Sequence, residues 1–156
     1  PACEHARAQH LQNLAQLRTD GTATNRSAKG AYELQAAEGG KAQVSLFASG
    51  SELEIAVAAR KPLAEKGARA RVVSVPSLEL LLAQDEATQN QIIGEAPVKI
   101  AIEAAVRFGW DAVIGHDGIF VGMASFGASG PYKDVYKHFG ITPEAVVEAA
   151  LKRHNG

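Results

Sequence analysis

The sequence has little cysteine, no long apolar run and almost no net charge. Its only cysteine is Cys3, so no disulfide can form within one chain and no cluster of thiolates can hold a metal. This scarcity favours a reducing compartment, and we expect a cytoplasmic protein. No apolar run approaches the roughly 20 residues that span a bilayer. The N-terminus also lacks the charged-then-apolar pattern of an export signal.

The balance of charge argues against two classes of partner. Sixteen Lys and Arg stand against 17 Asp and Glu, which gives a net charge of -1. Such a chain has no field that attracts nucleic acid or an acidic membrane surface, and we expect neither as a partner. The 156 residues, 46% of them hydrophobic, are typical of one folded domain. The chain begins at Pro1 without Met, so we expect it to be a piece of a longer protein.

The titratable residues show no metal-binding or catalytic spacing. The histidines lack the H-x-x-x-H and H-E-x-x-H patterns of zinc sites and are expected at the surface; they are His5, His10, His116, His138 and His154. His116 is followed by Asp117, but adjacent residues in a turn seldom converge on one reacting atom. We therefore predict no metal site and no catalytic residue in this chain.

Alternating strand and helix patterns predict a three-layer α/β sandwich. Residues 1–30 read as an arm and linker, and the globular part is expected over 31–156. Strands are predicted at 31–36, 43–49, 68–75, 98–105 and 118–123. Residues 43–75 read as strand, helix, strand, which is the length of one parallel crossover. Further helices are predicted within 77–94, 130–140 and 142–154, with Asp85 and Thr142 as N-caps.

The helix between the first two buried strands carries contradictory signals. Ser51 and Glu54 have the spacing of a capping box at its start. Pro62 would delete one backbone hydrogen bond and crowd the carbonyl of Ala58, which predicts a kink or an early end. Gly67 is expected to terminate the helix in either case.

Two glycine-containing loops before predicted helices are candidate anion sites, because exposed N–H groups at a helix start carry partial positive charge. The candidate residues are Ser49, Gly50 and Ser51 in one loop and Gly127, Ala128 and Ser129 in the other. Neither loop matches G-x-G-x-x-G or G-x-x-x-x-G-K-[ST]. The alternative is that both loops only turn the chain and cap a helix.

Three further features have structural interpretations. Glu103 lies on an otherwise apolar strand, and we expect its carboxylate to accept hydrogen bonds from loop N–H groups near the strand's end. Met123 and Phe126 are expected in the core. The basic run is most simply a solvated face; it consists of Arg60, Lys61, Lys66, Arg69 and Arg71.

Three segments together resemble the C-terminal domain of transketolases. They are "SLFASGSELEIAVAARKPLAEKGARARVVSVPS", "KIAIEAAVRFGW" and "GHDGIFVGMASFGASGPYKDVYKHFGITPEAVVEAA", in unbroken order. The resemblance runs from about Asn13 to the end of the chain. The stretch "QNLAQL" at 12–17 is similar to the end of the family's middle, pyrimidine-binding domain, so residues 1–30 would be the tail of that domain plus a linker. Leu11 stands where the family usually has an Arg that holds the substrate's phosphate, and no substrate residue is carried over.

The resemblance implies a parent enzyme of the pentose phosphate pathway that uses thiamine diphosphate and a divalent metal, Mg or Ca. Such an enzyme moves a two-carbon ketol unit from a ketose phosphate to an aldose phosphate and is a cytosolic homodimer. In the family the N-terminal and middle domains hold the cofactor and the metal. The third domain resembles a mixed, mostly parallel five-stranded sheet that packs against them. His116, Asp117 and Gly118 do not match the G-D-G motif that holds the diphosphate.

From this resemblance we expect the 156 residues alone to bind no cofactor and to transfer no ketol group. Their expected role is structural, in the packing of domains. The alternative is a stand-alone α/β module that binds a small anion or effector.

Overall fold

The computed structural model describes residues 26–123 and 132–155. The strands are β1 (Tyr32–Gln35), β2 (Val44–Ala48), β3 (Ala70–Ser74), β4 (Val98–Glu103) and β5 (Ile119–Gly122). The helices are the 3-10 helix η1 (Arg26–Lys29), α2 (Glu52–Glu65), α3 (Leu78–Leu82), α4 (Glu86–Ile93), α5 (Asp111–Ile114), α6 (Tyr132–His138) and α7 (Pro143–His154). All five predicted strands are present at the predicted places.

The strands form one mixed sheet in the order β1-β3-β2-β4-β5. β2 pairs in parallel with β3 on one side and with β4 on the other, and β4 pairs in parallel with β5. Only β1 is antiparallel, at the edge beside β3. The mostly parallel five-stranded sheet expected from the sequence is therefore confirmed.

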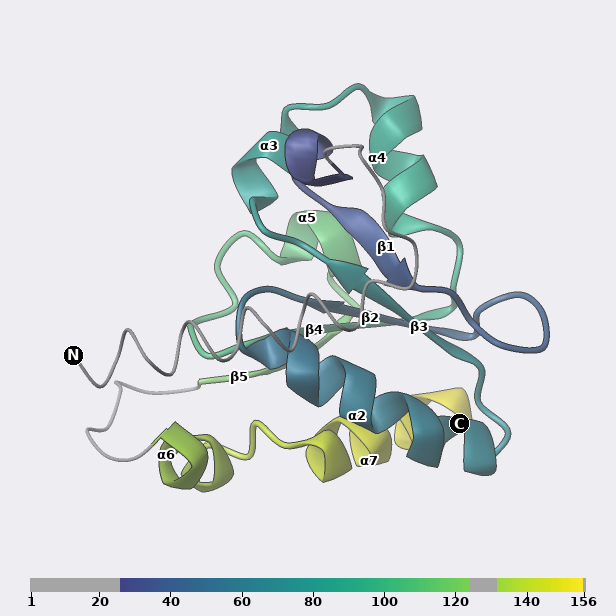
Figure 1. Cartoon of the computed structure of the whole chain (residues 1–156), viewed down its shortest axis with the longest axis vertical. Helices are drawn as coiled ribbons and strands as arrows, with labels where there is room; N and C mark the ends of the chain where they lie inside the picture. Colours follow the sequence, from purple (N-terminus) through teal and green to yellow (C-terminus); the bar gives the residue numbers. More distant parts are fainter. Residues whose placement is uncertain (1–25, 124–131, 156) are drawn as a thin grey trace.

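Helices cover both faces of this sheet, which makes three layers (Figure 1). α2 and α7 lie side by side on one face, whereas α3 and α5 pack on the other. Successive residues of a strand point to opposite faces. In β2, for example, Leu46 belongs to the core under α2 and α7, and Phe47 belongs to the core under α3 and α5. Strands covered on both faces are rich in apolar residues, as β2 is in its sequence VSLFA, all of it buried.

Helix α2 differs from its sequence prediction in two ways. The hydroxyl of Ser51 makes no capping hydrogen bond, so the predicted capping box is wrong. The helix also continues through Pro62 to Glu65, so the predicted early end is wrong. Pro62 lies in the last turn of the helix and interrupts one backbone hydrogen bond only. The carbonyl that loses its donor is that of Ala58, which is an exposed residue.

The other helix signals are confirmed. The carboxylate of Asp85 accepts a hydrogen bond from the Thr88 N–H at 2.9 Å, and the Thr142 hydroxyl accepts one from the Ala145 N–H at 3.2 Å. Pro143 occupies the first turn of α7. Gly67 follows α2 with a φ of +81°, a conformation that side chains other than glycine rarely adopt.

Two short elements were not predicted. α5 has four residues and η1 has four, too few to show a helical period. η1 lies within the stretch that the sequence indicated as linker, and it packs against α3 and β1. Gly30 makes this packing possible, because a Cβ there would lie 2.2 Å from the backbone N of Leu81.

Candidate functional site

The carboxyl ends of β2 and β4 mark the place where a ligand would be expected in a sheet of this topology. The two strands are adjacent and parallel, but the chain leaves them toward opposite faces: α2 follows β2 on one face, and α5 follows β4 on the other. Clefts in open parallel sheets form at such a divergence. Ser49 follows β2 directly, and Glu103 is the last residue of β4.

Ser49 and Glu103 bridge this divergence. The Ser49 hydroxyl donates to Glu103 Oε2 at 3.0 Å. Glu103 thus lies at a strand end, as predicted, but its recorded partner is a hydroxyl of the neighbouring loop rather than a backbone N–H. Burial raises the pKa of Glu103, the bond from Ser49 opposes that rise, and the nearby carboxyl group of Glu52 adds to it.

A second carboxyl group, that of Glu52, lies beside the first. Glu52 is the first residue of α2 and is 4% exposed. Its Oε1 accepts hydrogen bonds from the Ser51 hydroxyl at 3.2 Å and from the Tyr136 hydroxyl of α6. The hydroxyls of Ser51 and Tyr136 are themselves 2.9 Å apart. Burial, followed by the bond to Glu52, raises the pKa of Tyr136, which is therefore a neutral donor at physiological pH.

These residues form one polar group at the switch point of the sheet, the place where the connections after β2 and β4 diverge to opposite faces. We call it the switch-point cluster; its members are Ser49, Ser51, Glu52, Glu103 and Tyr136. A neutral tyrosine and two hydroxyls satisfy the buried acceptors, so the arrangement fastens α6 and β4 to the start of α2. It holds two carboxyl groups and no cation. A cluster of this charge is poorly suited to an anionic ligand.

The predicted anion loop at 49–51 is built into this cluster. The Ser49 and Ser51 hydroxyls are bonded as described, and the Glu52 N–H donates to the Ser49 carbonyl at 3.1 Å. Gly50 is exposed, with a φ of +49°. Anion binding there stays a prediction. The other candidates, Gly127, Ala128 and Ser129, lie outside the described residues.

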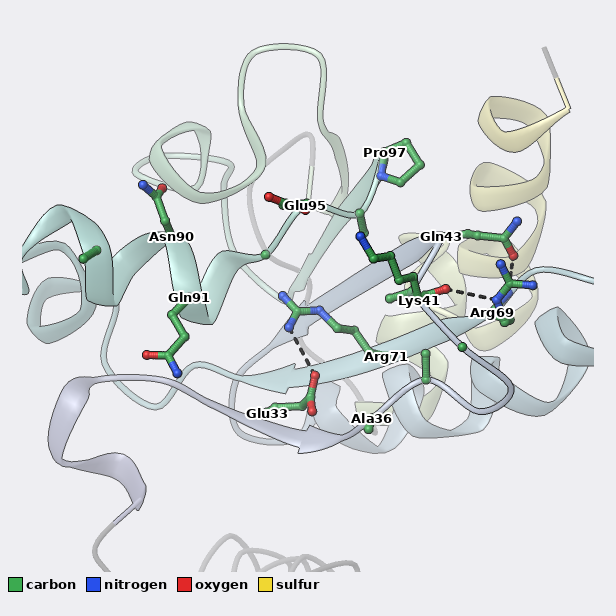
Figure 2. A pocket seen from close by; sticks show the side chains of 16 residues that line it. Glu33, Ala36, Lys41, Gln43, Arg69, Arg71, Asn90, Gln91, Glu95 and Pro97 are labelled. Atoms are coloured by element: carbon green, nitrogen blue, oxygen red, sulfur yellow. Dashed lines mark hydrogen bonds and ion pairs between the residues drawn. The ribbon is translucent and has the colours of Figure 1, made fainter.

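A groove of about 900 Å³ opens at the opposite end of the sheet, beside the amino ends of β3, β2 and β4. Figure 2 shows its polar side chains: Lys41, Gln43 and Arg69 line one end, and Asn90 and Gln91 of α4 line the other. The Arg69 Nε donates to the Lys41 carbonyl at 3.0 Å. The groove is open and its lining is mixed in charge: Lys41 and Arg69 lie at one end, and the carboxylates of Glu33 and Glu95 also line it. The end at Lys41 and Arg69 is the part of the groove that could attract a small anion.

Arg71, at the floor of this groove, corrects the prediction of a solvated basic face. The residue is 9% exposed. Its Nε donates to Ser45 Oγ at 2.8 Å and its Nη1 to Glu33 Oε2 at 3.2 Å, the pair joined in Figure 2. Its Nη2 donates to the carbonyls of Ile92 and Ile93, the last two residues of α4. Arg71 therefore joins β1, β2 and β3 to the end of α4.

Arg60 is also engaged rather than freely solvated. Its guanidinium donates to Gln35 Oε1 and to the Ala36 carbonyl, both at 2.7 Å, and its Nη2 lies 3.2 Å from Glu38 Oε1. It thereby holds the segment after β1 against α2. Lys61 and Lys66 are exposed, as predicted.

The remaining candidates do not assemble into a site. His116 and Asp117 are both exposed, and the contact between Arg107 and His116 is to the backbone carbonyl of His116, not to its imidazole. Met123 packs against the core, as predicted, whereas Phe126 lies outside the described residues. Among the residues that the structure describes, no three His, Cys, Asp or Glu side chains gather as a metal site would require. No helix in this part of the chain has the length and apolar character to cross a bilayer.

Sequence reasoning missed Glu52 and Tyr136. The two residues are 84 positions apart, and neither belongs to a motif. The local signal at Glu52 was misleading, because an acidic residue in the first turn of a helix is ordinarily exposed and favourable to the helix dipole. The burial of Glu52 and its hydrogen bond from Tyr136 of α6 became apparent only from the folded chain.

Comparison with known proteins gives a consistent result. Residues 30–142 match the model of the transketolase-like TK C-terminal domain. The chain is 51% identical over 142 residues to the transketolase of Sinorhizobium medicae, covering 90% of this chain and 20% of that protein. It is 49% identical over 141 residues to that of Rhodobacter capsulatus, covering 86% and 21%. The solved transketolase from Leishmania mexicana superposes with a TM-score of 0.75 at 36% identity, covering 87% and 19%. The chain thus spans about a fifth of the length of these relatives.

Proposed function

The chain belongs to the transketolase family through its C-terminal domain, and from this we propose that it is the third domain of a longer enzyme, the parent. The parent would transfer a two-carbon ketol unit from a ketose phosphate to an aldose phosphate, with thiamine diphosphate as cofactor. The observation that supports this most strongly is the match over residues 30–142 together with 51% identity to a transketolase. The shared sheet topology supports the same assignment.

We place the cofactor elsewhere in the parent. Thiamine diphosphate carries a diphosphate group, and the family binds it with a divalent metal, Mg or Ca. The switch-point cluster presents the carboxyl groups of Glu52 and Glu103, which would repel a diphosphate. The described residues at this edge of the sheet therefore do not fit the cofactor, and no step of the reaction is assigned to them.

The role proposed for this domain is structural. Both faces of its sheet are covered by its own helices, so it has an independent core. We propose that it packs against the N-terminal and middle domains of the same chain. A cytoplasmic homodimer acting on sugar phosphates is part of the same proposal and rests on the family resemblance. The boundary between the linker and the domain, near residue 30, also stays a prediction.

A ketol-transfer assay tests the proposal. The parent is incubated with thiamine diphosphate, Mg²⁺, a ketose phosphate donor and an aldose phosphate acceptor, and the 156-residue chain is assayed in parallel after circular dichroism has shown that it is folded. We expect turnover by the parent and none by the 156-residue chain. An inactive parent would count against the proposed activity. Turnover by the short chain would count against the structural role.

The second candidate is a module that binds a small anion or effector, and the cations of Lys41 and Arg69 at one end of the groove favour it. Titration calorimetry with phosphate, sugar phosphates and nucleotides distinguishes the two. Saturable heat that disappears in Arg69→Gln would support the binding module. A purely structural domain gives no saturable heat with any of the three.

A further inference from the structure

The large apolar side chains that remain exposed are confined to two segments of the described chain. Val106 is 61% exposed and Phe108 is 92% exposed, and both lie on the connection between β4 and α5. Leu80 and Leu82 of α3 are 49% and 36% exposed. Single exposed apolar residues are ordinary, whereas a group of them on neighbouring segments marks an interaction surface.

The two segments meet in the fold. A Cβ built on Gly109 would lie 3.2 Å from Leu78 Cδ2, so the residue after Phe108 approaches the first residue of α3. Leu78 and Trp110 both pack on the core under α3 and α5. Figure 1 shows the β4–α5 connection looping out on the side of the sheet that carries α3. Val106, Phe108, Leu80 and Leu82 are together called the apolar rim.

Arg107 holds the connection in place between the two exposed residues. Its Nε and Nη2 lie 2.8 and 2.6 Å from Asp111 Oδ1. Nη2 also donates to the carbonyls of Gly115 and His116 at 3.2 and 3.1 Å. Trp110, 4% exposed, anchors the other end of the connection in the core. Phe108 is therefore presented on a loop whose conformation is already set, which reduces the entropy lost when a partner covers it.

We propose that the apolar rim is the surface by which this domain docks onto the preceding part of the same polypeptide, with Phe108 as its central anchor. This rests on the proposed function. About four fifths of the length of the relatives lies outside the matched region, so in the proposed parent a large covalently attached partner is available to this surface. Its contact surface would be apolar and hollowed to accept an aromatic ring, because buried aromatic side chains carry most of the binding energy of such contacts.

A thiol-labelling experiment on the parent tests the docking surface. Phe108→Cys and the matched control Lys152→Cys are made separately, the control being an exposed residue of α7, on the other face of the sheet. Each variant is labelled with a maleimide under native and denaturing conditions, and the modified peptide is quantified by mass spectrometry. Because Phe108 makes little contact within the domain, its replacement should not impair folding.

We expect the ratio of native to denatured labelling to be at least about tenfold lower at position 108 than at position 152. Such a ratio results when the interface is open, and the thiol accessible, in at most about one molecule in ten. Hydroxyl-radical oxidation of the native Phe108 in the unmodified parent should be suppressed in the same way, which covers the case in which the cysteine itself loosens the contact. Equal labelling at both positions together with full oxidation of Phe108 overturns the proposal. So does protection that disappears on dilution, because a second copy would then be the occupant.

The outcome is separable from that of the ketol-transfer assay. If the parent is active but position 108 is freely labelled and oxidised, the proposed function stands and the docking surface is refuted. If the parent is inactive but position 108 is protected, the proposed activity is refuted and the docking surface stands.

Discussion

Replacing Arg71 by methionine tests the contacts that join β3, on the floor of the groove, to β1, β2 and α4. Methionine keeps most of the aliphatic stem and removes the guanidinium, so the volume of the core is roughly preserved. The substitution deletes the hydrogen bonds to Ser45, to Glu33 and to the last two carbonyls of α4.

The magnitude follows from which of these acceptors can reach water. The Glu33 side chain is 42% exposed and rehydrates readily, whereas Ser45 is fully buried. An acceptor that stays buried without a partner costs about 1 to 3 kcal/mol. Three acceptors besides Glu33 lose their partner, and the adjoining groove admits water to part of the site. We therefore expect Arg71→Met to lower the free energy of unfolding by about 3 kcal/mol in total.

Urea unfolding followed by far-UV circular dichroism measures this change. With a slope of about 2 kcal/mol per molar, the midpoint should fall by roughly 1.5 M. Arg69→Met is the matched control, because Arg69 lies two residues away on the same groove and its guanidinium makes one recorded bond, to the exposed carbonyl of Lys41. Its midpoint should move by less than about 0.5 M, as for an ordinary surface substitution. Equal shifts in the two variants would refute the assignment of Arg71 as a buried structural cation.

Three further substitutions probe other parts of the fold. Tyr136→Phe removes a donor to the buried carboxyl group of Glu52 and should destabilise the domain by about 1 to 3 kcal/mol in thermal unfolding; an unchanged midpoint would count against the α6 contact. The raised pKa of Glu103 means that its contribution to stability is present at low pH and is lost as the pH rises through its folded-state pKa. Glu103→Gln should therefore flatten the pH dependence and stabilise the domain at neutral pH, and a variant that is less stable at pH 7 would contradict this. Thr142→Ala deletes the cap of α7 and should cost about 1 kcal/mol in urea unfolding, with Thr142→Ser, which keeps the hydroxyl, as the control.

Most of the fold was accessible from the sequence because its signals are local. The buried strands are short apolar runs bounded by Gly, Pro or polar residues, as at 43–49, and such runs predict strands covered on both faces. Capping depends on residues three positions apart, which is why Asp85 and Thr142 were assigned correctly. The capping signal failed at Ser51, where Glu52 and the Tyr136 hydroxyl engage the serine side chain instead.

The candidate site was less accessible. Ser49 and Glu103 were recognised separately, but the bond between them joins residues 54 positions apart. It exists because β2 and β4 are neighbours in the sheet, although β3 lies between them in the sequence. Strand order is decided by the packing of whole layers, and no local pattern records it.

What the sequence alone determined is the family, the alternation of strands and helices, and the positions at which most helices begin and end. Each of these depends on residues within a few positions of one another or on a motif retained in order. Only the tertiary structure decided that Arg71 is a buried structural cation, that Glu52 is bonded to Tyr136 of α6, and that Phe108 is left exposed. The physical reason is that burial and pairing depend on which segments the sheet order brings together, and those segments are far apart in the chain.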